Sequence, residues 1–339
     1  MADVALGVIG CGGMARAHMR NAVRVPGLRL RGYADAVPAA AERFRHEFGG
    51  DYATADPERV LRDPAVDAVL IATHHDSHPG LAVRAARAGK HVLIEKPLAL
   101  TVDECLRVEE AVAHAGVVLM VGFQRRFAPL VLLARRLVPR PFLSLGQMMD
   151  NRWGDTIWTQ DPIRGGGNVI SQGCHTFDLL CYLHQDEPVA VYAAGGTFTH
   201  DPQATTVIDN VAATVRFAGG GAAAVVQGDG GLPEHVSKFF FEVFDGERAA
   251  QLYDRLHHMT VSGPGQLPTA RYAAAAEAPG EDPEGLAQEL AEFVRCAASG
   301  VASPIGATAR DGTRATALAL AIFESVRTGQ PQPLSLPRS

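Results

Sequence analysis

Apolar positions in the first third of the chain form short continuous runs separated by segments with helical spacing. The run Val4–Ile9 is followed by apolar residues at Ala15, Met19 and Ala22, a spacing typical of a helix. Further strands are expected at 28–35, 66–72, 91–95 and 117–123, and helices at 38–48, 78–88 and 102–114. Continuous apolar strands that alternate with helices predict a parallel sheet covered on both faces.

Beyond Phe123 the pattern changes to strands joined by short, glycine-containing loops. Strands are expected at 189–195, 207–217, 221–228 and 239–245, and helices at 129–138, 175–183, 283–298 and 307–328. Consecutive strands with short connections predict an α/β domain with a large open, mostly antiparallel sheet. At 339 residues the chain is long enough for two domains, which we expect at 1–123 and 124–339.

The turn after the first strand, Gly10-x-Gly12-x-x-Ala15, has the pattern of a dinucleotide-binding motif. Gly10 permits a tight turn, Gly12 leaves room for phosphates to approach the backbone, and Ala15 allows close packing of helix on strand. Free N–H groups where the helix begins, at Gly13 and Met14, favour negative charge. The motif therefore predicts a Rossmann, doubly wound parallel sheet in the N-terminal domain.

Asp35 ends the second predicted strand, 25 positions after Gly10, which is close to the spacing at which a carboxylate meets the adenosine ribose. A carboxylate accepts hydrogen bonds from a free 2′-hydroxyl and repels a 2′-phosphate, and the following residue is Ala36 rather than an arginine. We therefore expect NAD in preference to NADP. Asp35 is also placed to cap the next helix, and both roles can hold together.

Composition excludes several classes of function. With 47% apolar and 20% charged residues the chain is globular, and a net charge of −6 without a basic cluster argues against nucleic-acid binding. No apolar segment is long enough to span a bilayer, and no basic region precedes a signal-like run. The five scattered cysteines lack a C-x-x-C pair and fit reduced thiols, so we expect a cytoplasmic protein without membrane partners.

A first polar cluster is Glu95-Lys96-Pro97, at the C-terminal end of a predicted parallel strand. Ligands of doubly wound sheets bind beyond these strand ends. A lysine placed beside a nicotinamide in a partly closed cleft can exchange protons with a substrate. The alternative is an ordinary surface lysine at the end of a strand.

A second cluster follows the glycines at 165–167, where His175 and Asp178 lie three residues apart on one face of a helix. Imidazole suits proton transfer, and a neighbouring carboxylate could fix its tautomer. Alternatively, Asp178 is simply an acidic residue that favours the helix N-terminus. The third cluster, His74–His78, follows a predicted strand and lacks a second group of ligands, so we expect a loop over the cofactor and no metal.

Together these motifs resemble those of the glucose–fructose oxidoreductase/inositol dehydrogenase (Gfo/Idh/MocA) family. The resemblance spans nearly the whole chain, and its further carriers are Gly-Phe-Gln-Arg-Arg-Phe at 122–127 and Gly173-x-His175-x-x-Asp178. It implies NAD(H)-dependent hydride transfer at a secondary hydroxyl or ketone of a sugar, cyclitol or related polyol. It also implies a C-terminal domain whose open sheet mediates oligomer contacts, so that a homodimer or homotetramer is expected.

The resemblance implies the roles of individual residues as well. Lys96 and His175 would be catalytic, through proton transfer at the reacting hydroxyl. Cofactor contacts are implied for Gly10, Gly12, Gly13, Met14, Ala15, Asp35, Thr73, His74, His78, Glu95, Lys96, Pro97 and Gln124. Substrate contacts are implied for Lys96, Arg126, Asn151, Trp153, Ser171 and His175. Pro97 would follow a cis peptide, and Trp153 could alternatively fill the domain interface.

Two positions depart from the family pattern. Many of these dehydrogenases carry an aspartate four positions before the histidine, where this chain has Ser171. A serine can hydrogen-bond a sugar but cannot stabilise a charged histidine, which leaves Lys96 as the principal acid and base. His74 stands where a proline is common. A redox-neutral, NAD-dependent glycoside hydrolase and a non-catalytic dinucleotide-binding sensor therefore stay open as alternatives.

Overall fold

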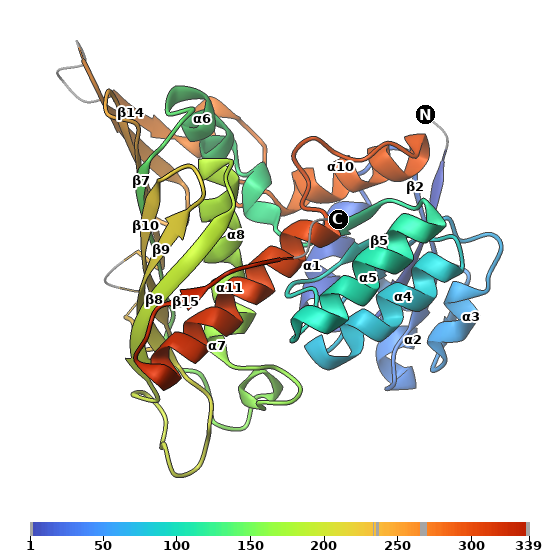
Figure 1. The fold of residues 1–339 in the computed structure, drawn as a ribbon. Coiled ribbons are helices and arrows are strands. Elements are labelled where there is room, and N and C mark those ends of the chain that lie inside the picture. The colour runs from blue at the N-terminus through green and yellow to red at the C-terminus, as the bar shows by residue number, and fades with distance from the viewer. Residues whose placement is uncertain (1–2, 233, 235–236, 265–269, 337–339) are drawn as a thin grey trace. The chain divides into compact units, whose positions relative to one another are not determined.

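The computed structural model describes residues 3–232, 234, 237–264 and 270–336, and the chain divides into two compact units (Figure 1). The first unit comprises Met1–Gln124 and Leu286–Thr313, and the second comprises Arg125–Gly285 and Arg314–Ser339. The predicted division placed all of 124–339 in the second domain. The structure differs from it because one late segment packs with the first unit.

Six parallel strands form the sheet of the first unit, in the order β3-β2-β1-β4-β5-β6. The strands are β1 (Val4–Ile9), β2 (Leu28–Ala34), β3 (Tyr52–Thr54), β4 (Ala68–Ile71), β5 (His91–Ile94) and β6 (Leu119–Val121). β1 and β4 are buried throughout, as their continuous apolar sequences predict. The strand order reverses between β1 and β4, and open sheets of this type bind ligands beyond the strand ends at such a reversal.

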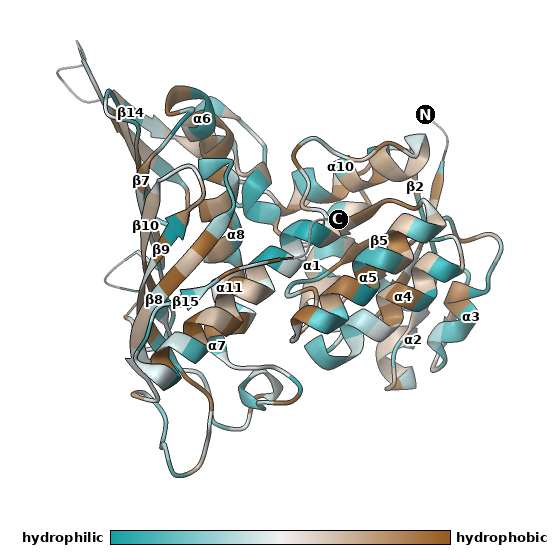
Figure 2. Ribbon diagram, viewed as in Figure 1, coloured by the Kyte–Doolittle hydropathy of each residue, from teal (hydrophilic) through white to brown (hydrophobic). Residues whose placement is uncertain are grey.

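Helices of the first unit connect and cover these strands. They are α1 (Gly13–Ala22), α2 (Pro38–Phe48), α3 (Pro57–Leu61), α4 (His78–Arg87), α5 (Val102–Ala115) and α10 (Leu286–Ser299). α4 and α5 carry both apolar and polar bands (Figure 2), and most of their buried residues are apolar, such as Leu81 of α4 and Val108 of α5. α10 contacts α1 and β1, which explains why Leu286–Thr313 belongs to this unit.

Nine strands among the described residues form the sheet of the second unit, in the order β14-β13-β12-β11-β7-β10-β9-β8-β15. They are β7 (Leu143–Met149), β8 (Pro188–Gly196), β9 (Asn210–Phe217), β10 (Ala222–Gly228), β11 (Phe239–Phe244), β12 (Ala249–Tyr253), β13 (His258–Ser262), β14 (Ala270–Ala273) and β15 (Gln332–Pro333). All neighbours are antiparallel except β7 and β10, which confirms the predicted mostly antiparallel sheet. Buried and exposed residues alternate along β9, so that one face of the sheet is covered.

The covering helix of this sheet is α8 (Gly173–His184), which is buried along its whole length and contacts β7 and β10. Further helices of this unit are α6 (Pro129–Leu137), α7 (Asn168–Ser171) and α9 (Ala274–Glu277), with the short 3-10 turn η3 (Trp158–Gln160). α11 (Ala309–Thr328) and the 3-10 turn η2 (Gln124–Phe127) begin in the first unit and continue in the second, and the 3-10 turn η1 (His75–Ser77) belongs to the first unit. In the described part of the chain, no helix has the length and apolar character that a membrane crossing requires.

Candidate active site

The glycines of the turn after β1 have different roles: the fold requires a glycine at Gly10, whereas Gly12 and Gly13 border open space. Gly10 has a φ of +92°, and a Cβ there would lie 2.4 Å from the carbonyl oxygen of Ala72. At Gly12 and Gly13, a Cβ would meet no heavy atom of the described residues within 4 Å. Both are exposed at the start of α1, where unpaired N–H groups favour an anion.

Asp35 joins this turn to the end of β2. Its Oδ2 accepts a hydrogen bond from the Cys11 N–H (2.8 Å), and its Oδ1 accepts one from the Val37 N–H (2.8 Å), just before α2 begins. Asp35 is not the N-cap of α2, as the alternative expected: the N-cap is Val37, whose N–H Asp35 accepts. Burial, with a further contribution from the Asp35 charge, raises the pKa of the Cys11 thiol to about 12, so this thiol is no nucleophile.

The loop after β4 carries the predicted cofactor residues Thr73, His74 and His78. The Thr73 hydroxyl lies 2.6 Å from that of Ser77, and His74 is exposed. His78 is fully buried, with Nδ1 2.8 Å from the carbonyl oxygen of Pro97 and Nε2 3.2 Å from that of Thr73. Burial lowers the pKa of His78, and its ring connects this loop to the segment that follows β5.

The Glu95-Lys96-Pro97 segment lies at the C-terminal end of β5, and the peptide between Lys96 and Pro97 is cis, as predicted. Glu95 is buried, and its Oε1 lies 2.8 Å from Nε2 of His18, while Oε2 accepts the Lys96 N–H at 3.3 Å. Burial raises the pKa of Glu95, but the His18 hydrogen bond and nearby charges outweigh it and hold the pKa below its usual value. An ionised carboxylate thus precedes the half-buried Lys96.

His18 is a member of this group that sequence analysis missed. It lies on α1 with no exposed surface, between the buried residues Ala15 and Met19. The sequence does place this histidine on the apolar face of a helix. A buried histidine needs a polar partner, so this position indicates that a partner exists. That partner, Glu95, is 77 positions away, so the local pattern could not identify it.

In the second unit, a buried ion pair joins Arg126, predicted near the substrate, to Asp178, the carboxylate expected beside His175. Arg126 Nε donates to Asp178 Oδ2 (2.8 Å) and Nη2 donates to Oδ1 (2.5 Å), while the guanidinium lies 4.9 Å from the ring centre of Tyr182. This bidentate pair gives Asp178 a role beyond favouring the start of α8. Ser171, in α7, and His175, in the first turn of α8, are also buried.

The segment before η3 is held by hydrogen bonds to two aspartates. The indole N–H of Trp153 donates to Asp150 Oδ2 (3.1 Å), and its backbone N–H donates to Asp229 Oδ2 (3.2 Å). Asn151 is exposed, and its side-chain amide donates to Glu234 Oε1 (3.1 Å). Trp153 is half-buried, so this segment combines an ordered aromatic ring with an accessible amide.

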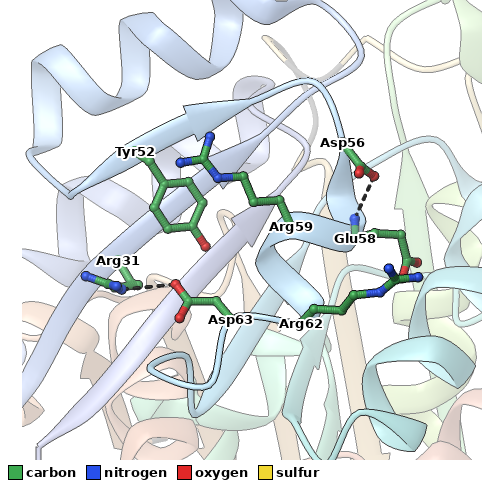
Figure 3. A pocket seen from close by; sticks show the side chains of 7 residues that line it. All are labelled: Arg31, Tyr52, Asp56, Glu58, Arg59, Arg62 and Asp63. Atoms are coloured by element: carbon green, nitrogen blue, oxygen red, sulfur yellow. Dashed lines mark hydrogen bonds and ion pairs between the residues drawn. The ribbon is translucent and has the colours of Figure 1, made fainter.

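A separate pocket of about 430 Å³ lies beside β3 of the first unit (Figure 3). Its lining residues are Arg31, Tyr52, Asp56, Glu58, Arg59, Arg62 and Asp63. The guanidinium of Arg59 lies 4.3 Å from the ring centre of Tyr52, and Arg31 Nε donates to Asp63 Oδ2 at 3.1 Å. Three arginines are matched by three carboxylates, and no predicted site residue lines this pocket, so we do not assign it to the active site.

A six-stranded parallel sheet with an open glycine turn at a helix start defines the first unit as a dinucleotide-binding Rossmann domain. Comparisons with known proteins agree. Residues 4–123 match the family model described as "Oxidoreductase family, NAD-binding Rossmann fold", and residues 143–239 match the GFO/IDH/MocA C-terminal domain. These matches define an NAD-dependent oxidoreductase.

Two curated relatives match over nearly the full length of the chain. The chain is 30% identical to inositol 2-dehydrogenase 2 of Saccharopolyspora erythraea, over 98% of this chain and 95% of the relative. It is 27% identical to 1,5-anhydro-D-fructose reductase of Ensifer adhaerens, over 96% of each protein. A solved levoglucosan dehydrogenase shares the fold with a TM-score of 0.89 at 24% identity, over 98% of this chain and 99% of that one. The chain belongs to the Gfo/Idh/MocA family of oxidoreductases.

Proposed function

We propose that this protein is a dehydrogenase that transfers a hydride between a secondary carbinol carbon of a sugar, cyclitol or related polyol and NAD. The observation that carries the proposal is Lys96, placed directly after a buried, ionised Glu95 at the C-terminal end of β5. This edge of a doubly wound sheet is where such folds bind ligands. The names of the relatives support the substrate class, since they act on inositols and on anhydro-sugars.

In the direction of oxidation, neutral Lys96 accepts the hydroxyl proton, directly or through His175, while the carbinol hydrogen leaves as a hydride. When bound, NAD⁺ supplies the hydride acceptor. The substrate thereby loses two electrons and becomes a ketone, and in reduction the same side chains return the proton. Gly12, Gly13 and Met14 would face the pyrophosphate, and Asp35 would hold the adenosine ribose.

The second unit would supply the substrate contacts. Asn151 presents an exposed amide, and Trp153 presents a ring held by Asp150 and Asp229. Ser171 offers a hydroxyl on the helix before His175, where the family commonly has a carboxylate. Because a serine cannot stabilise an imidazolium, the main proton acceptor in this chain would be Lys96.

We also propose that the protein is a homodimer or homotetramer formed through the uncovered face of the nine-stranded sheet. On that face Tyr192 of β8 is 49% exposed and Val226 of β10 is 36% exposed, so apolar surface is available for burial. Light scattering of the purified protein tests this proposal. A monomer at micromolar concentration would contradict it.

NADH formation at 340 nm tests the function, with purified protein, NAD⁺ and a panel of inositols, aldoses, anhydro-sugars and sugar acids at mildly alkaline pH. NADP⁺ is run in parallel. We expect turnover with one group of polyols and with NAD⁺ in preference to NADP⁺. Nothing in the comparisons supports the hydrolase or the sensor. Release of product from chromogenic glycosides without net NADH, on a flat polyol panel, would replace the dehydrogenase with the hydrolase.

A further inference from the structure

Three loop residues of the second unit, His200, Asp209 and Asp229, come together in its interior. One donor atom of each lies within 4.8 Å of the others. His200 belongs to the connection between β8 and β9, Asp209 directly precedes β9, and Asp229 directly follows β10. Neither aspartate has exposed surface, and His200 is 8% exposed. No motif in the sequence brings these residues together, and the proposed reaction does not use them.

Asp209 supplies charge and position in this cluster rather than a free lone pair. Its two oxygens accept the backbone N–H groups of Phe198 (2.8 Å), Thr199 (2.9 Å) and His200 (3.0 Å). The side-chain amide of Asn210 donates to it as well, at 2.8 Å. These bonds fix the backbone from which the His200 ring projects.

The His200 ring is oriented by carboxylates at both of its nitrogens. Nδ1 lies 2.8 Å from Asp155 Oδ1, and Nε2 lies 2.8 Å from Asp229 Oδ2. Asp155 is paired with Arg152 (2.5 Å), which balances its charge outside the cluster. With an ion at Nε2, Asp155 would accept the Nδ1–H, as carboxylates commonly do for metal-bound histidines.

Gln160 packs against this cluster, and its side chain carries a second buried oxygen, besides Asp229 Oδ1, without a hydrogen-bond partner in the described part of the chain. Its Nε2 lies 2.8 Å from His200 Nε2 and 3.3 Å from Asp229 Oδ2. Its Oε1 is buried and accepts no hydrogen bond from the described residues, and the same is true of Asp229 Oδ1. Gln160 itself is 7% exposed, so two buried acceptor oxygens at this point lack a donor.

Burial lowers the pKa of His200, but its hydrogen bonds to Asp229 and Asp155 outweigh burial and raise it. An imidazolium would donate to Asp155 through Nδ1 and to Asp229 through Nε2, yet its single charge would balance only one of the two buried carboxylates, Asp209 and Asp229. If Nε2 carries a lone pair, that lone pair faces Asp229 Oδ2 at 2.8 Å without a proton between them. A half-turn of the Gln160 amide exchanges its nitrogen and oxygen without a change of shape, and Oε1 then joins Nε2 and Oδ2 as a third acceptor.

We propose that these groups bind a divalent transition-metal ion of the Zn²⁺ type, through His200 Nε2, the Asp229 carboxylate and Gln160 Oε1. For ligands about 2.0–2.2 Å from one ion, separations of 2.8–3.3 Å correspond to ligand–ion–ligand angles of about 80–110°, so the three groups would occupy neighbouring positions around the ion. The two charges of the ion balance the buried carboxylates of Asp209 and Asp229 beside a neutral imidazole. A donor set that includes imidazole favours such ions over Mg²⁺ and Ca²⁺.

The ion would connect three separate parts of the second unit. Gln160 lies in η3, His200 precedes β9, and Asp229 follows β10. Asp229 also accepts the backbone N–H of Trp153. The site is therefore structural, and it holds the segment that precedes η3 against the edge of the sheet. The proposal is independent of the proposed dehydrogenase activity, because its readouts are metal content and thermal stability.

The test uses the full chain, stripped with a chelator and titrated with Zn²⁺, with bound metal measured by equilibrium dialysis and elemental analysis. We expect about one ion per chain and a rise in Tm of about 5–10 °C at free zinc 100-fold above Kd. Co²⁺ in place of Zn²⁺ should give visible ligand-field absorption. No stoichiometric binding by the wild-type chain would overturn the proposal.

Variants locate the ion. Asp229→Asn and His200→Gln should lose the bound zinc and the zinc-dependent rise in Tm. His258→Gln is the matched control, because His258 is exposed and lies 3.4 Å from Asp254 in a histidine–carboxylate pair elsewhere in the unit. It should bind zinc like the wild type. If the charge variants do not fold, Gln160→Met removes only the amide and should weaken binding. Undiminished zinc binding in the variants that fold would refute the assignment.

Discussion

The glycine turn permits a test that separates what the fold needs from what the cofactor needs. In Gly10→Ala, the new Cβ would lie 2.4 Å from the Ala72 carbonyl oxygen and 2.8 Å from Thr73 Cγ2, on a backbone with φ of +92°. In Gly12→Ala, it would enter space that no described residue occupies, on an extended backbone with φ of −91°. Only the first change therefore strains the protein itself.

These geometries set the expected losses of stability and of NADH affinity. The left-handed conformation costs an alanine about 1–2 kcal/mol, and overpacking against a backbone carbonyl costs about 1–3 kcal/mol. Gly10→Ala should therefore lose about 2–5 kcal/mol of stability and about 4–20 °C in Tm. Gly12→Ala should keep its Tm but lose a hydrogen bond from backbone to pyrophosphate, which weakens NADH binding about 10- to 150-fold.

Thermal unfolding and NADH titration by fluorescence measure the two effects on the same samples. Gly13→Ala is the control for stability, because Gly13 begins α1 and its Cβ would also meet no described atom within 4 Å. Its Tm should equal or exceed that of the wild type. Wild-type NADH affinity in Gly12→Ala, or a fall in its Tm like that of Gly10→Ala, would refute the reasoning.

Three further predictions concern single side chains. Burial lowers the pKa of His184 to about 4, which is below the value of about 6.5 in the unfolded chain. The stability that neutral His184 contributes is therefore present above pH 6.5 and is lost as the pH falls toward 4. Urea unfolding of His184→Gln should show an acid-induced loss smaller than the wild type's by up to about 3 kcal/mol, and an unchanged loss would contradict this. Asp178→Asn leaves Arg126 buried without its carboxylate and should cost about 3–5 kcal/mol of unfolding free energy; a change under 1 kcal/mol, on the order of a surface pair, would count against a structural role. Asp35→Asn should narrow the preference for NAD⁺ over NADP⁺ in steady-state kinetics, and an unaltered preference would remove Asp35 from cofactor selection.

Much of the first unit can be predicted from sequence because its signals are local. Pro38 at the start of α2 and Gly49 after its end delimit that helix, and continuous apolar runs mark β4 and β5. The glycine turn and the cis peptide before Pro97 are also recognisable, since each depends on neighbours in the chain.

The strands of the second unit are harder to predict from sequence because several of them lack a local pattern of apolar residues. β7 was missed because its buried positions include Ser144 and Gly146, and at Gly146 a Cβ would lie 3.0–3.1 Å from side chains of α8. An apolar pattern is absent where a helix packs this closely on a strand. β12, β13 and β14 were missed as well, and the return of α10 to the first unit has no signal in its own residues.

The polar sites show the same limit. The adjacent histidines at 74–78 lack a second group of ligands, so the sequence predicts no metal there. The proposed ligands Gln160, His200 and Asp229 are 29 or more positions apart, and only the strand order of the second sheet brings them together. Glu95 and His18 are paired in the same way across 77 positions.

We propose that Lys96 moves the proton of a substrate hydroxyl while the carbinol carbon gives its hydride to NAD. Turnover of Lys96→Met and Lys96→Arg on the best polyol of the panel, with NADH affinity measured in parallel, tests it most directly. Lys96→Arg is the matched variant, because it keeps a positive charge that cannot accept a proton. We predict that both variants bind NADH and lose about 10²–10⁴ in turnover. Wild-type turnover in either variant would contradict the account.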